Sequence, residues 1–186
     1  MPGTARVPES PDAAEPRREG PSLVWAGPAD GPTVVVLDPA GEAKHGELPP
    51  TWADLVARRR VCWVRLPVEG ALTEAEELLS DPSGLGTPLD IVVSGPLAFE
   101  GLDMATRHPD VVRSVLVVDP EPGEHVDRRL RDLAEAGVTA TVVARRAASE
   151  RDRIPPPLPL GHPDVTAAVA GAVADLDRGV TGRGPG

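Results

Sequence analysis

The sequence predicts an α/β fold: a mainly parallel sheet of about six strands with helices on both faces. Short runs of β-branched residues recur along the 186 residues, and stretches with helical periodicity lie between them. Residues 89–120 combine a strand, a tight turn, a helix and a second strand. A βαβ unit of this length implies parallel strands, because its two strands are joined by a helical crossover.

The turn in residues 89–120 is the sharpest strand-to-helix turn that the sequence predicts. Ile91–Val93 form a β-branched run that suits a buried strand, and Ser94-Gly95-Pro96 follow. The next helix places Ala98, Leu102 and Ala105 on one stripe, and Gly101 allows that helix to approach the sheet closely. His108-Pro109 ends the helix, since a residue before proline avoids helical angles.

The remaining elements follow from the same periodicities. We expect strands at residues 23–26, 33–37, 61–66, 115–118 and 139–144, and helices near 126–136 and 165–176. Two further helices begin near Thr51, as an N-cap, and at Thr73, as the first residue of a capping box that ends at Glu76. The i, i+4 spacing of Asp103 and Arg107 predicts an ion pair.

Residues 92–120 resemble the α/β-hydrolase family in the turn, the helix after it and the Arg-His-Pro segment that leads to Leu-Val-Val-Asp-Pro. The family motif G-x-S-x-G places a serine nucleophile at the tip of the turn. Counted back from His108-Pro109, the motif falls on residues 93–97, so Gly95 occupies the nucleophile position. Glycine has no side chain with which to attack a substrate.

Other positions also depart from the family pattern. Asp38-Pro39 stand where the family has His-Gly before the oxyanion-hole loop, and a carboxylate there opposes a developing oxyanion. Arg65 stands where the family often has an aspartate. Only one helix is predicted between residues 120 and 139, where the family inserts a cap. The resemblance therefore implies an α/β-hydrolase-like domain without a cap.

The resemblance also suggests catalytic candidates. Ser94 could act as nucleophile if the turn were shifted by one residue, or it could simply cap the helix. Gly161-His162-Pro163 resembles the segment of the family histidine, and Asp152 resembles its acid, with Asp119 as an alternative acid at a strand end. For ligand binding at the former cleft, the candidates are Asp38, Gly95 and Pro96.

Two functions follow. The departures from the motif favour a non-catalytic module that binds a small molecule or a protein partner. The alternative is a minimal esterase or thioesterase that uses Ser94 and His162. Its support is the acyl-transfer chemistry that the resemblance to the family implies. We favour the non-catalytic module, because the esterase would require three motif positions to work despite their departure from the family pattern.

Composition narrows the partners. A formal net charge of −10 argues against nucleic acid and anionic membranes. Cys62, the single cysteine, excludes an internal disulfide and suits a core thiol. We find no metal or cofactor pattern, and no apolar run of signal or membrane length, so a cytoplasmic protein is expected. Arginine supplies all but one of the 19 basic residues, which indicates a GC-rich genome.

The expected organisation is a disordered proline-rich leader at 1–20, one domain at 21–178 and a disordered tail at 179–186. Relative to the family, a cap and a last strand are missing. Their loss exposes apolar surface, so we expect a homodimer or another protein partner to cover the sheet edge or the cleft.

Overall fold

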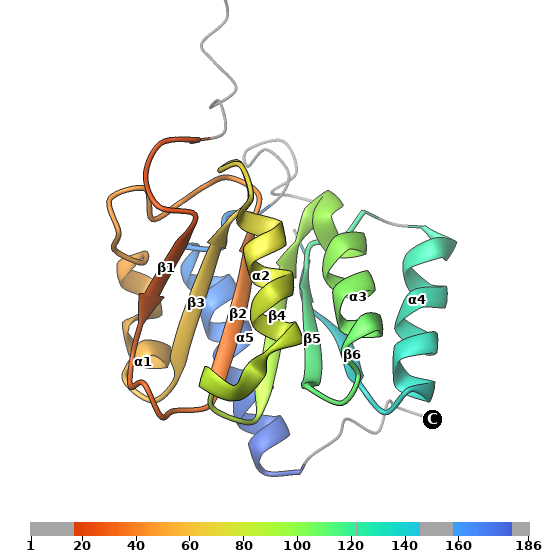
Figure 1. The fold of residues 1–186 in the computed structure, drawn as a ribbon. Coiled ribbons are helices and arrows are strands. Elements are labelled where there is room, and N and C mark those ends of the chain that lie inside the picture. The colour runs from red at the N-terminus through yellow and green to blue at the C-terminus, as the bar shows by residue number, and fades with distance from the viewer. Residues whose placement is uncertain (1–16, 122, 146–157, 180–186) are drawn as a thin grey trace, which may run out of the picture.

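The computed structural model describes residues 17–121, 123–145 and 158–179. Its centre is a six-stranded sheet in the order β1-β3-β2-β4-β5-β6 (Figure 1). The first strand runs antiparallel to β3, and the other neighbours are parallel. The strands are β1 (Leu23–Ala26), β2 (Thr33–Asp38), β3 (Arg60–Arg65), β4 (Leu89–Ser94), β5 (Val112–Val118) and β6 (Thr139–Ala144).

Helices cover both faces of the sheet, as the sequence predicts. On one face lie α2 (Ala71–Ser80), α3 (Ala98–Arg107) and α4 (Glu124–Glu135), and on the other lie α1 (Ala53–Val56) and α5 (Pro163–Asp177) (Figure 1). Three short 3-10 turns complete the elements: η1 (Pro50–Trp52), η2 (Pro82–Gly84) and η3 (Gly95–Leu97). This is the α/β-hydrolase-like architecture that residues 92–120 suggest. Between β5 and β6, the described residues form one helix, α4.

The core consists of two clusters, one on each face of the sheet. Both central strands, β2 and β4, are buried at all six positions because helices cover them on both sides. Cys62 lies in this core, where burial raises the pKa of its thiol to about 12, as expected for an unreactive cysteine.

The helix after the turn packs as its sequence predicts. Ala98, Leu102 and Ala105 are buried against the sheet, and α3 ends at Arg107 before His108-Pro109. A Cβ added to Gly101 would lie 2.0 Å from Cγ1 of Val93. Glycine is therefore what lets α3 approach β4 this closely.

The predicted Asp103–Arg107 ion pair is wrong. Arg107 instead donates to both carboxylate oxygens of Glu76 on α2, at 2.9 and 2.8 Å, and Asp103 pairs with Arg129 on α4. Both residues find partners on neighbouring helices, which the spacing within one helix does not reveal.

Both predicted threonine caps are also wrong. The N-cap of α2 is Gly70, with a left-handed φ of +82°, so Thr73 lies inside the helix. The hydroxyl of Thr51 donates to the carbonyl of Gly161 at 2.8 Å, and the turn that contains Thr51 has no side-chain cap. At Thr51 the partner lies more than a hundred residues away, whereas at Thr73 the helix simply begins earlier, after Gly70.

Residues 17–20, which we assigned to the leader, run along the domain. The carbonyl of Arg17 accepts a hydrogen bond from Arg65 at 2.9 Å, and its N–H donates to Ala40 at 3.3 Å. Residues 1–16 and 180–186 lie outside the described residues. No helix of the described part is both long and apolar enough to cross a membrane.

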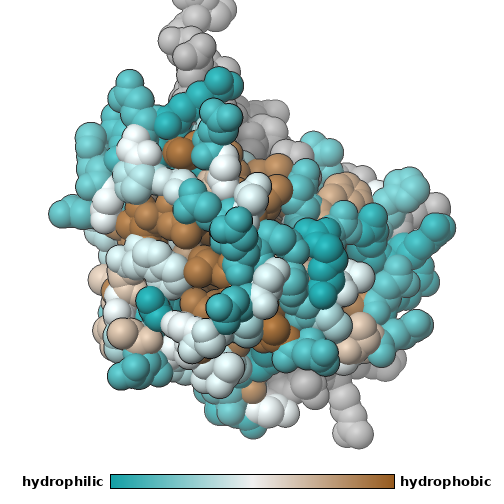
Figure 2. All heavy atoms as spheres, viewed as in Figure 1, coloured by the Kyte–Doolittle hydropathy of each residue, from teal (hydrophilic) through white to brown (hydrophobic). Residues whose placement is uncertain are grey.

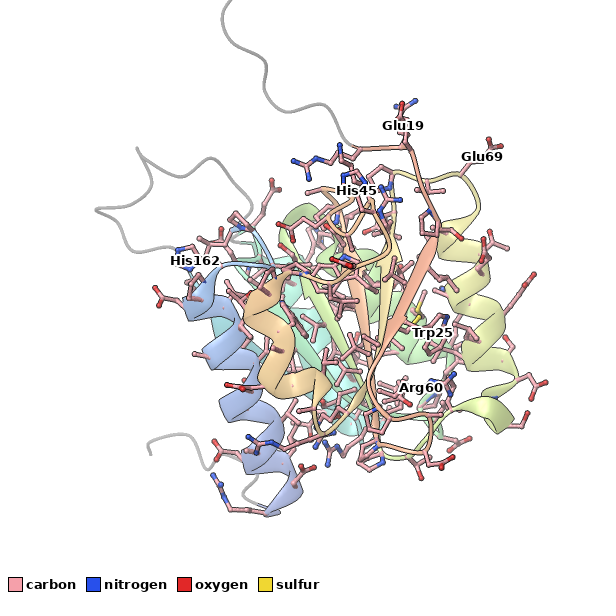
Figure 3. The ribbon with its side chains drawn as sticks, turned by 90° about the vertical axis from the view of Figure 1, so that its left-hand side faces the viewer. Glu19, Trp25, His45, Arg60, Glu69 and His162 are labelled. Carbon is pink, nitrogen blue, oxygen red and sulfur yellow. The ribbon has the colours of Figure 1, made fainter. Side chains whose placement is uncertain are left out.

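Hydrophobic residues gather on the surface over β1 and α2 (Figure 2). On these two elements Trp25 is 36% and Leu72 is 38% exposed. The guanidinium carbon of Arg60 lies 4.4 Å from the centre of the Trp25 ring, so a cation–π contact covers one side of this tryptophan (Figure 3).

Candidate functional site

The C-terminal ends of the parallel strands form one edge of the sheet, where α/β proteins bind ligands. Leu37 pairs with Val93, so the next residues, Asp38 and Ser94, occupy adjacent positions on β2 and β4. Asp38 also pairs with Arg65 on β3. We call this region the C-terminal edge. It contains most of the candidate residues.

Gly95 lies at the tip of the turn between β4 and α3. Its φ is +57°, in the left-handed region that only glycine adopts without strain. The chain passes directly from β4 into η3 and then α3. Gly95 is thus the left-handed residue of this strand-to-helix turn. Pro96 is the next residue of η3, and its side chain lies outside the described residues.

Ser94 is the last residue of β4 and is 1% exposed. Its hydroxyl donates to the carbonyl of Leu158 at 3.5 Å, the long limit of a hydrogen bond. It makes no side-chain cap to η3. Ser94 therefore occupies the N-cap position of η3 without a side-chain cap, and its hydroxyl contacts the segment before α5.

His162 is the N-cap of α5. Its Nδ1 accepts a hydrogen bond from the backbone N–H of Asp164 at 3.2 Å, and the nearest carboxylate oxygen of Asp164 is 3.9 Å away. Figure 3 shows the residue at the first turn of α5, at the margin of the molecule. Among the described residues, the hydrogen bonds of Ser94 and His162 lead to different partners.

The two candidate acids are placed differently. Asp152 lies outside the described residues. Asp119 follows β5 with a φ of +43°, and its backbone N–H donates to Ala144 at 2.7 Å. Asp119 thus lies at the C-terminal edge, one strand beyond Ser94.

Asp38 is buried at the end of β2. One carboxylate oxygen accepts from the indole N–H of Trp63 at 2.8 Å, and the other accepts from the backbone N–H of Ala40 at 2.8 Å. Burial raises the pKa of Asp38, although hydrogen bonds from Trp63 and from the backbone of residues 40–42 oppose the rise. A carboxyl group therefore fills the start of the loop that carries the oxyanion hole in the α/β-hydrolases.

Glu42, which the sequence analysis missed, is the second carboxyl of this loop. Burial, followed by the negative charge of Asp38, raises its pKa to about 7, while a hydrogen bond from the backbone of Gly161 and the charge of Arg17 oppose the rise. Its Oε2 atom is buried without a hydrogen-bond partner among the described residues. No local pattern marks Glu42, because the segment that covers it lies more than a hundred residues further along the chain.

Arg65 holds the loops around this edge together. Its fully buried guanidinium donates to the backbone carbonyls of Arg17, Pro21, Gly41 and Glu42 at 2.8 to 3.2 Å. All of its nitrogens are thereby engaged, so Arg65 stabilises the loops and is not available to an anionic ligand.

The C-terminal edge thus combines a glycine at the tip of the turn, a buried serine and two carboxyl groups with raised pKa values. Its carboxyl groups can take up and release protons, but the residue at the tip of the turn, Gly95, has no hydroxyl. In the described part of the chain, no three His, Cys, Asp or Glu residues come close enough to hold a metal ion.

Several solved structures resemble this chain at low sequence identity. No family model and no curated protein matches the sequence. A Bacillus subtilis protein thought to be a hydrolase superposes with a TM-score of 0.41 at 15% identity, covering 62% of this chain and 48% of that one. The thioesterase domain of the curacin biosynthetic pathway superposes with a TM-score of 0.37 at 15% identity, covering 61% of this chain and 49% of that one. A bacterial membrane phospholipase A superposes with a TM-score of 0.39 at 16% identity, covering 85% of this chain and 56% of that one. This chain thus spans about half the length of these proteins.

Proposed function

We propose that this chain is a non-catalytic α/β-hydrolase-like domain that binds a small molecule or a protein partner at the C-terminal edge. The observation that carries the proposal is the φ of +57° at Gly95, which identifies the tip of the turn at a residue without a side chain. Removal of a triad nucleophile lowers turnover by on the order of 10⁶. The scaffold then retains a binding edge without its main chemical group.

The neighbouring residues support the same proposal. By the family resemblance, Asp38 stands at the start of the oxyanion-hole loop, where a carboxylate would oppose the developing charge of an acyl-transfer intermediate. The hydroxyl of Ser94 points to Leu158, and Nδ1 of His162 is engaged by the first turn of α5. A general base must reach its nucleophile by hydrogen bonding.

The charged groups at this edge also limit the chemical class of the ligand. Asp38, Glu42 and Asp119 contribute carboxyl groups, and the guanidinium of Arg65 is occupied by backbone carbonyls. A ligand that carries a carboxylate or phosphate would find no available cation among these residues. We therefore propose a neutral or cationic ligand.

An ester-hydrolysis assay tests the proposal. We expect wild type, Ser94→Ala and His162→Ala to hydrolyse short-chain p-nitrophenyl esters no faster than buffer does. Thr73→Ala, an exposed change on α2, is the matched control for the effects of mutation and purification on the measured rate. A wild-type rate that is lost in both Ser94→Ala and His162→Ala, but kept in Thr73→Ala, would refute the proposal and identify a hydrolase that uses Ser94 and His162.

A further inference from the structure

The outer edge of β6 has no strand partner among the described residues. Its six residues, Thr-Ala-Thr-Val-Val-Ala, include no charge and no proline. Exposed edge strands are normally protected from other chains by lysine, proline, short length or a covering element. The opposite edge, β1, has only four residues and Arg60 beside its exposed tryptophan. Within the described part of the chain, β6 is therefore the less protected edge.

A hollow of about 540 Å³ lies beside this edge, between β6 and α5. The α5 side of the hollow is made of small residues, and the β6 side adds threonine and valine. The lining residues used in the argument below are Thr141, Val143, Ala168, Gly171, Ala172 and Leu176. The acidic residue in its lining, Asp175, is paired with Arg178, so the hollow presents little net charge.

Gly171 leaves open space on this side of α5. Glycine is a poor residue for a helix interior, and no atom lies within 4 Å of the position of an added Cβ at Gly171. At Gly101, by contrast, the added Cβ would meet Val93. The packing of one chain therefore explains Gly101 but not Gly171.

We propose that a second copy of this chain pairs with β6 in antiparallel fashion, about a two-fold axis through Thr141. In this register Thr141 faces its own copy, Thr139 faces Val143, and Ala140 faces Val142. Each opposed pair lies on the same face of the sheet, because the residue numbers in a pair differ by an even number. The contact is self-complementary, as a two-fold interface requires, and it continues one sheet across both copies.

The same axis brings the small residues of α5 toward the α5 helix of the other copy. Ala168, Gly171 and Ala172 lie on the side of α5 that borders the hollow, and small side chains allow two helices to approach closely. The uncharged strand also suits two copies that each carry a net charge of −10. Because that charge opposes association, higher ionic strength should strengthen the dimer.

The segments of this chain next to β6 and α5 are poor candidates to cover the edge. Residues 146–157 contain the run Pro155–Pro157 and are rich in charged residues, and residues 180–186 contain three glycines and a proline. Proline cannot donate to a ladder, and glycine weakens a strand. A second β6 supplies a complete row of donors and acceptors.

Light scattering on the full chain at tens of micromolar tests the proposal. We expect a mass of twice 19.4 kDa for wild type. Thr141→Lys places two like charges directly opposite each other and should raise the dissociation constant about tenfold or more. Gly171→Glu should do the same, and its side chain has open space in a single copy. Thr73→Lys on α2 is the matched control and should remain a dimer.

Disulfide trapping tests the register. Thr141→Cys should form a cross-linked dimer under mild oxidation, because directly opposed residues of antiparallel strands have the Cα separation that a disulfide needs. Thr139→Cys should not, since it faces Val143. Cys62 is buried and does not interfere. A single-chain mass for wild type, a dimer that persists in both Thr141→Lys and Gly171→Glu while their circular dichroism is native, or equal trapping at both positions would overturn the proposal.

Discussion

Asp90 and Asp38 are buried aspartates on the neighbouring strands β4 and β2, but they lie at opposite ends of the sheet and have different partners. Asp90, at the N-terminal end, accepts two hydrogen bonds from the guanidinium of Arg113 at 2.9 and 2.6 Å and one from Ser114 at 2.6 Å. A second guanidinium, from Arg59, lies 3.7 Å away. Its charge is therefore balanced by cations.

The same two arginines connect the sheet to α5. Arg113 donates to Asp177 near the end of that helix at 2.8 Å, and Arg59 pairs with the same carboxylate. The N-terminal edge is thus a closed network of two acids and two bases that fixes the end of α5 to β4 and β5.

Asp38 receives its hydrogen bonds from neutral donors, the indole of Trp63 and the backbone of Ala40, and a second carboxyl, Glu42, lies close by. Both carboxyls have raised pKa values, whereas the acid network at the other edge is paired with arginine. The comparison assigns the N-terminal edge a role in stability and leaves the C-terminal edge with two carboxyl groups whose pKa values are raised.

Arg113→Ala should give the largest effect on stability. It leaves the Asp90 carboxylate buried beside Ser114 and the more distant Arg59, and breaking a buried ion pair in this way costs about 3 to 5 kcal/mol. Urea unfolding measures the loss. Arg131→Ala, an exposed change on α4, should change the free energy of unfolding by less than about 0.5 kcal/mol. A loss below 1 kcal/mol for Arg113→Ala would remove the structural role that we assign to the N-terminal edge.

Glu42→Gln should stabilise the protein above neutral pH. The folded pKa of Glu42, about 7, is raised above the ordinary value of 4.5. The stability that this group contributes is therefore present below pH 4.5 and is lost as the pH rises through 7. Glutamine has no charge to bury, so we expect the variant to exceed wild type by about 1 to 3 kcal/mol at pH 8.

The gain of Glu42→Gln should shrink toward zero at pH 4.5, which urea unfolding at a series of pH values would show. Glu47→Gln changes an exposed residue of the same loop and serves as the control, with no such pH dependence expected. A gain that is equal at all pH values, or a loss at pH 8, would mean that Glu42 does not titrate as a buried acid.

Gly95→Ala should have the smallest effect. A φ of +57° costs a non-glycine residue about 1 to 2 kcal/mol, and thermal or urea unfolding can resolve a loss of this size. Gly84→Ala, at the other edge, is the matched control: no atom lies within 4 Å of its added Cβ, and its φ is not left-handed. If both changes have equal effects, the tip of the turn is not strained at Gly95.

Much of the fold could be predicted from the sequence because its signals are local. The β-branched run at residues 139–144 locates β6, and the stripe Ala98, Leu102 and Ala105 identifies the buried face of α3. Burial of β2 and β4 on both faces also follows from their continuous apolar runs. In each case the evidence lies within a few turns or residues of the chain.

The C-terminal edge was predicted only in part. Gly95 was placed at the tip of the turn from its distance to His108-Pro109, and its left-handed φ agrees with that placement. The contact between Ser94 and Leu158 spans sixty-four residues, and no local pattern indicates it. Glu42 and the role of Arg65 were missed for the same reason, since their partners come from separate loops.

The sequence by itself determined the order of strands and helices along the chain, their buried faces and the glycine at the turn between β4 and α3. These properties depend on the periods of strand and helix and on residue identity, which any chain segment carries with it. Only the tertiary structure decided which charges pair and which carboxyl titrates near neutrality. Ion pairing and desolvation depend on distance in space and on burial, so Asp103 found Arg129 and Glu42 acquired its raised pKa only when separate loops and helices came together.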